Sequence, residues 1–182
     1  SKVTDMSNMF EGNVLLENIE ISSFRTRKVK DMSNMFKELS SIKSLDLSLF
    51  DTSSVSDMSS MFDSCQVLSY LDISKFNTMK VSRMDCMFNN CKSLRSIDIT
   101  NFDTSQVTNL TAMFSGCSSI TFLDVSKFDT RATKYMAGMF SKCSNLENLN
   151  LENFRTFQIT DFSNMFNSCQ KLKNLDISYI DT

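Results

Sequence analysis

Residues 53–78 read SSVSDMSSMFDSCQVLSYLDISKFNT, and variants of this stretch fill the whole chain. Its Met-Phe pair returns every 26 residues without insertion or deletion. The seven copies are Met9-Phe10, Met35-Phe36, Met61-Phe62, Met87-Phe88, Met113-Phe114, Met139-Phe140 and Met165-Phe166. A threonine column has the same period: Thr26, Thr52, Thr78, Thr104, Thr130, Thr156 and Thr182. Seven repeats account for all 182 residues, so the chain is predicted to be a tandem-repeat protein.

Positions within each repeat are numbered as slots 1 to 26, counted from the first residue of the chain. Slots 3, 6, 9, 10, 16, 19, 21 and 24 are apolar, and slot 13 is usually Cys. Val55, Met58 and Met61 have the spacing of one face of a helix. Leu71 and Ile73 alternate with polar neighbours, as in a half-buried strand. A unit this small cannot bury its own apolar face, so successive copies must stack.

The predicted fold is therefore an α/β solenoid, a right-handed superhelix of the leucine-rich-repeat type. We expect one domain over residues 1–182, with one short parallel strand and one short helix or turn per repeat. The Phe columns at slots 10 and 24 should stack inside. The threonine column should serve in a turn, or either Thr or the neighbouring Ser should cap the segment that follows. Neither end has a polar cap, which favours a fragment of a longer surface protein or a unit that stacks head to tail.

The stretch from Cys65 to Ile73 carries C-x-x-L-x-x-L-x-I, whose strand part matches the core of leucine-rich repeats. The unit from Val55 to Phe76 resembles the 26-residue repeat of bacterial surface proteins related to the BspA-like leucine-rich repeats, also found in mycoplasma surface lipoproteins. The resemblance covers all seven repeats. It implies an extracellular protein at the cell surface that functions in adhesion or host-protein binding, and it supplies no catalytic residues.

The composition narrows the function. The chain has no His, so it lacks the commonest general base and metal ligand, and we expect no enzymatic activity. The net charge of −2 gives no reason to expect a nucleic-acid partner. No apolar run approaches the ~20 residues that cross a bilayer, so we expect no membrane insertion by this segment.

Five of the six cysteines share slot 13. Their side chains should point the same way in successive repeats and their number is odd, so a buried column of free thiols is predicted rather than disulfides. The sixth, Cys86, falls in slot 8 and is expected near the surface. No His completes a metal site with any of them, so none is predicted. The five slot-13 residues are Cys65, Cys91, Cys117, Cys143 and Cys169.

Slots 18, 20 and 22 should face solvent, since slots 19 and 21 face the core. Slot 20 is an acidic column, and three interpretations of it stay open. Each carboxylate can bond a nearby Ser, Thr or backbone N–H, the column can bind calcium, or it can face a basic protein. It lacks the clustered calcium-loop pattern, and no other cofactor is expected. The column comprises Glu20, Asp46, Asp72, Asp98, Asp124, Asn150 and Asp176.

Slot 18 breaks the repeat symmetry, because it holds Tyr70 and Phe122 among small polar residues. Exposed aromatic rings near charges often anchor interfaces, although isolated surface aromatics without a partner are also common. The predicted binding surface comprises Tyr70, Asp72, Asp98, Phe122 and Asp124. We expect a binding or adhesion module for a host or cell-surface protein or glycan. The alternative is a structural stalk, or a filament formed by end-to-end self-association.

Overall fold

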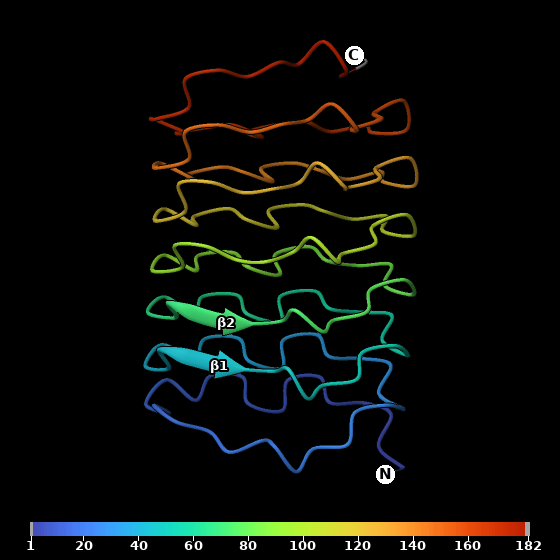
Figure 1. Cartoon of the computed structure of the whole chain (residues 1–182), viewed down its shortest axis with the longest axis vertical. Coiled ribbons are helices and arrows are strands. Elements are labelled where there is room, and N and C mark those ends of the chain that lie inside the picture. The colour runs from blue at the N-terminus through green and yellow to red at the C-terminus, as the bar shows by residue number, and fades with distance from the viewer. Residues whose placement is uncertain (1, 181–182) are drawn as a thin grey trace.

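The chain forms a stack of similar coils, one for each repeat, with the two termini at opposite ends of its long axis (Figure 1). The computed structural model describes residues 2–180. The colours follow one another in order along the stack, so each coil lies beside its neighbours in sequence (Figure 1). The outermost residues of the predicted 1–182 domain, Thr182 of the threonine column among them, lie outside the described residues.

The regular secondary structure consists of two short strands, β1 (Ser44–Asp46) and β2 (Tyr70–Asp72), which pair in parallel in neighbouring coils (Figure 1). Residues 2–180 contain no other strand and no helix. In the later coils the same line of pairing is reduced to single bridges, which join Phe122 to Asn148 and Asn148 to Asn174. We expected one strand in each repeat, but within residues 2–180 only the second and third coils contain a segment long enough to be a strand.

The segment from slot 6 to slot 13, for which the spacing predicted a short helix or turn, is a series of turns. Its N–H groups are used alternately. Those of Ser60 and Phe62 donate to the next coil, to the carbonyls of Asp85 at 2.8 Å and Met87 at 2.9 Å. The N–H of Met61 donates within its own coil, to the carbonyl of Met58 at 3.3 Å. An α-helix needs every N–H for a partner in its own segment, so bonding to the next coil excludes it.

Two backbone positions in each repeat have a left-handed conformation, which breaks any helix. Slot 8 has a positive φ in every coil, at Asn8, Asn34, Ser60, Cys86, Ala112, Gly138 and Asn164. Slot 12 also has a positive φ in every coil, at Gly12, Glu38, Ser64, Asn90, Gly116, Lys142 and Ser168. The Asn, Gly and Ser residues common in both slots are frequent in turns, and Gly and Asn tolerate this conformation best.

The core runs along the stack and contains a continuous column of aromatic rings. The slot-10 rings from Phe10 to Phe166 stack with centroids 5.5–6.0 Å apart and planes within 12° of parallel. This is the offset-parallel arrangement that aromatic pairs favour, and it confirms the predicted slot-10 column. The slot-24 rings are also inside, with Phe24 and Phe50 stacked at 6.1 Å.

The threonines of slot 26 that lie within residues 2–180 are buried, and their column joins the coils. The hydroxyl of Thr52 donates to the carbonyl of Asn77 at 3.0 Å and accepts the N–H of the same residue at 2.7 Å. The local N–H of Ser53 instead donates to the carboxylate of Asp51 at 3.0 Å. The predicted capping role is therefore wrong for this hydroxyl, which crosses to the next coil and satisfies two backbone groups there.

Candidate binding faces

The acidic column at slot 20 is organised by local hydrogen bonds. In Asp72 one carboxylate oxygen accepts both the N–H of Ser74 at 3.0 Å and its hydroxyl at 2.7 Å. Asp124 binds Ser126 in the same way. Each pair closes a turn of the kind that Asp forms with a residue two positions on. The bonded slot-22 N–H cannot also donate to a neighbouring coil, so regular strand pairing ends near this point.

These bonds favour the charged form of the carboxylates. The hydroxyl of Ser126, and then its N–H, lower the pKa of Asp124, and the hydroxyl and N–H of Thr100 do the same to the pKa of Asp98. Hydrogen bonding to an ionised oxygen stabilises it. Asp98 and Asp124 are therefore ionised at neutral pH.

A groove of about 510 Å³ opens on this face across the fifth to seventh coils, and we call it the Phe122 groove. Its floor includes Leu123 and Leu149, which are buried. The side chains at its rim belong to slots 18 and 20 of three successive coils: Phe122, Asp124, Asn148, Asn150, Asn174 and Asp176. Phe122 is 65% exposed although its neighbour Leu123 is in the core.

The structure separates the predicted site residues into two groups. Phe122 and Asp124 lie together in the Phe122 groove. Tyr70 is 58% exposed in β2 with Asp72, two coils away, which is about 10 Å at a spacing of about 4.8 Å per coil. Asp98 lies in the coil between them and bonds Thr100. Tyr70, Asp72 and Asp98 share the face with the groove but do not line it.

Asn148, Asn150 and Asn174 complete the rim, and none of them was predicted as a site residue. The bridges that join Phe122, Asn148 and Asn174 place them in one row. Asn150 is the one amide in an otherwise acidic column. The three residues of the row occupy slot 18 in consecutive repeats, so an alignment of neighbouring repeats would have placed them beside one another.

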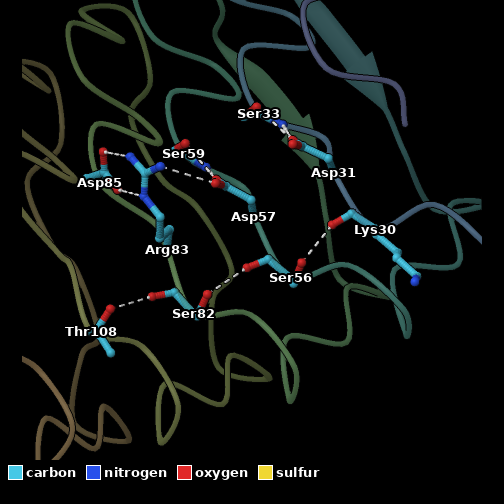
Figure 2. Close-up of polar contacts among 10 residues, drawn as sticks. All are labelled: Lys30, Asp31, Ser33, Ser56, Asp57, Ser59, Ser82, Arg83, Asp85 and Thr108. Carbon is cyan, nitrogen blue, oxygen red and sulfur yellow. Dashed lines mark hydrogen bonds and ion pairs between the residues drawn. The ribbon is translucent and has the colours of Figure 1, made fainter. Parts of the chain in front are cut away.

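A second face is formed by slots 4, 5 and 7, where the symmetry is broken by Arg83 (Figure 2). Its guanidinium binds Asp85 of its own coil through Nε at 3.1 Å and Nη2 at 3.0 Å, and it reaches Asp57 of the preceding coil at 3.3 Å. The side chain is half exposed, so these ion pairs are screened and contribute little stability. Asp57 and Asp31 also accept hydrogen bonds from Ser59 and Ser33.

Slot-4 hydroxyls run beside this charged group as a chain of bonds from coil to coil (Figure 2). Ser56 donates to the carbonyl of Lys30 at 3.1 Å, Ser82 to that of Ser56 at 3.2 Å, and Thr108 to that of Ser82 at 3.1 Å. The polar groups of this face are thus largely bonded to one another, which leaves few of them available to a ligand.

A model described as "Mycoplasma protein of unknown function, DUF285" matches residues 1–97 and again residues 64–180. The chain belongs to this DUF285 family. The two matches overlap, as expected when a family model spans several copies of one repeat. No curated protein matches the chain.

The cysteines of this DUF285 chain are free thiols. In slot 13, Cys65 donates to the carbonyl of Phe36 at 3.0 Å and Cys91 to that of Phe62 at 3.2 Å. Burial raises the pKa of Cys65 to about 12 and that of Cys91 well above its ordinary value. The buried, protonated thiols of slot 13 are therefore poor nucleophiles. Cys86, in slot 8, is half-buried.

Within residues 2–180, no three His, Cys, Asp or Glu side chains are grouped so that they can hold a metal ion. Nor does this part of the chain contain a helix long and apolar enough to span a membrane.

Proposed function

We propose that the chain is a non-catalytic binding module of the extracellular cell surface, which binds a host or cell-surface protein or glycan through the face that carries slots 18 and 20. In this proposal the stacked coils are a right-handed solenoid of the BspA-like leucine-rich-repeat type. The observation that carries it is the Phe122 groove, where one exposed ring and a row of amides interrupt an otherwise regular column.

The contrast between the two faces supports this choice. On the slot-5 face the charged side chains bind one another, as Arg83 binds Asp57 and Asp85. At the Phe122 groove the side-chain nitrogens of Asn148 and Asn174 donate to no residue within 2–180. Unbonded polar groups around an apolar surface are the usual composition of a ligand site.

The test is adhesion of the labelled chain to cultured host cells, measured by flow cytometry. Phe122→Ala removes the exposed ring from the groove, and Tyr135→Ala removes a comparably exposed ring from the slot-5 face as the matched control. We expect Phe122→Ala to lower adhesion by about tenfold, the effect of losing one interface anchor, and Tyr135→Ala to leave it unchanged. Equal adhesion of both variants and the parent chain would contradict the proposal.

A second candidate is end-to-end association of copies, as in a filament. It is supported by the contacts between successive coils, which use the same slots along the stack: the slot-10 rings of Phe62 and Phe88, for example, stack with their centroids 5.6 Å apart. Sedimentation velocity over a range of concentrations tests this function: growth into long species supports it, and a constant monomer rejects it.

A further inference from the structure

The Phe122 groove has a chemistry that is specific enough to indicate a class of ligand. We infer that it binds a neutral glycan, stacked on Phe122 and hydrogen-bonded by the amides of Asn148, Asn150 and Asn174. The inference rests on the proposed binding function and narrows its ligand.

The rim of the groove has unused hydrogen-bonding capacity. The Nδ2 groups of Asn148, Asn150 and Asn174 have no acceptor among the described residues, whereas Oδ1 of Asn150 is already bonded to the N–H of Glu152 at 3.0 Å. An Asn side chain offers both donors and an acceptor. Sugar hydroxyls also donate and accept hydrogen bonds. A row of amides with unused donors and acceptors can therefore form hydrogen bonds with several hydroxyls of one sugar.

The two carboxylates at the rim add acceptors. Ser126 occupies Oδ1 of Asp124, and the N–H of Ser178 occupies Oδ1 of Asp176 at 2.8 Å. Oδ2 of each accepts no bond from residues 2–180. Hydrogen bonds from Ser126 and Ser178 lower the pKa of Asp124 and Asp176, so both acceptors are ionised at neutral pH and suit hydroxyl donors.

The aromatic ring supplies the apolar contact. Phe122 is 65% exposed and stands at one end of the amide row. One face of a hexose ring presents C–H groups, and these gain dispersion energy against an aromatic surface. The groove thus offers an aromatic ring to contact the C–H face of a sugar and amides to form hydrogen bonds with its hydroxyls.

Charge and size select among ligands. No Lys or Arg lines the groove, and its charged side chains are acidic, so sulfated, sialylated or phosphorylated ligands are repelled. Its volume of about 510 Å³ is within the usual range for small-ligand sites, about 300–1,000 Å³. A protein interface needs about 800 Å² from each partner and usually several aromatic or Arg anchors, whereas the groove has a single ring.

The experiment is saturation-transfer NMR of the whole chain with neutral oligosaccharides of N-acetylglucosamine, mannose and galactose, and with sialylated and sulfated oligosaccharides. We expect binding of at least one neutral probe and of none of the charged probes. In ¹⁵N–¹H correlation spectra of the labelled chain, we expect the bound probe to shift the side-chain amide signals of Asn148 and Asn174. Phe122→Ala should weaken the binding by about tenfold or more. Asn148→Asp, which keeps the shape but removes the donor, should weaken it similarly.

Tyr70→Ala is the matched control, since Tyr70 is an exposed ring in the same slot two coils away, and it should bind like the parent chain. Circular dichroism establishes that each variant is folded. The inference is overturned if no neutral probe binds, or if Phe122→Ala and Asn148→Asp bind as the parent does. If no neutral probe binds but Phe122→Ala still lowers adhesion to cells, the neutral-glycan inference is rejected and the proposed binding function stands. If Phe122→Ala also leaves adhesion unchanged, both the inference and the proposed function are rejected.

Discussion

Thr78 and Asp103 lie in successive coils and exchange two hydrogen bonds: the Thr78 hydroxyl donates to the Asp103 carbonyl at 2.9 Å and accepts its N–H at 2.7 Å. Thr78 is 1% exposed. Thr78→Val keeps the shape of the side chain and leaves both backbone groups without that partner. We expect a loss of about 1–3 kcal/mol in the free energy of unfolding, measured by urea denaturation. Thr121→Val, at an exposed hydroxyl, is the control and should change it by less than about 0.5 kcal/mol.

Substitution within the slot-10 aromatic column should destabilise the chain more than Thr78→Val does. Phe88 is fully buried between Phe62 at 5.6 Å and Phe114 at 5.5 Å. Phe88→Ala opens a cavity in the core and should cost about 3–5 kcal/mol in the free energy of unfolding. Phe157→Ala, at a ring that is 62% exposed, should be nearly neutral. A similar midpoint of denaturation for the two variants would show that the column is not what holds the coils together.

The left-handed slot 8 predicts two substitutions of opposite sign in adjacent coils. Ala112 has a φ of 54° and Gly138 a φ of 62°. Ala112→Gly relieves backbone strain and should raise the melting temperature, whereas Gly138→Ala introduces strain and should lower the melting temperature. Each substitution should change the free energy of unfolding by about 1 kcal/mol. A β-carbon at Gly138 would meet Ser141 at 3.7 Å, an ordinary contact, so backbone strain alone decides the sign. Calorimetry that gave both variants the same sign would reject this explanation.

The buried thiols predict alkaline instability. Unfolded thiols ionise above their ordinary pKa of 9.0, whereas burial raises the pKa of Cys65 and Cys143 to about 12 in the folded chain. A raised folded pKa stabilises the chain below pH 9, and this contribution is lost as the pH rises toward 12. Each such thiol should cost about 1.4 kcal/mol of stability at pH 10.

The measurement is the melting temperature between pH 8 and pH 10. The double variant Cys65→Ala with Cys143→Ala is less stable at pH 8, because it loses packing, but its stability should fall less steeply with pH. Equal slopes for the variant and the parent chain would mean that other groups control the alkaline transition.

The 26-residue period predicted the repeat organisation, because an uninterrupted spacing places each residue beside its equivalent in the preceding and in the following repeat. Its apolar slots also predicted the core, including the Phe88 column. The turns were harder to foresee. Val55, Met58 and Met61 have helix-like spacing, but successive turns bury the same slots, and the deciding feature is the backbone at Ser60 and Ser64. Serine alone does not specify a left-handed conformation.

The candidate site was predicted in part. Phe122 stood out within its own column, and Asp124 followed from the acidic slot 20. Asn148 and Asn174 are ordinary residues within their repeats, and they matter only because coil stacking puts them in line with Phe122. A binding surface that crosses coils is a property of three repeats together, which no single repeat encodes.

The alternating use of N–H groups in the turns also constrains how such a gene can change. Ser60 and Phe62 donate to carbonyls 25 residues ahead, so adding or deleting a single residue in a coil would mismatch every bond on both sides of it. Exchange of entire repeats keeps each donor opposite an equivalent acceptor. Gain or loss of entire repeats can therefore lengthen or shorten the molecule in whole coils, while the Phe122 groove is inherited only when its three consecutive coils move as one block.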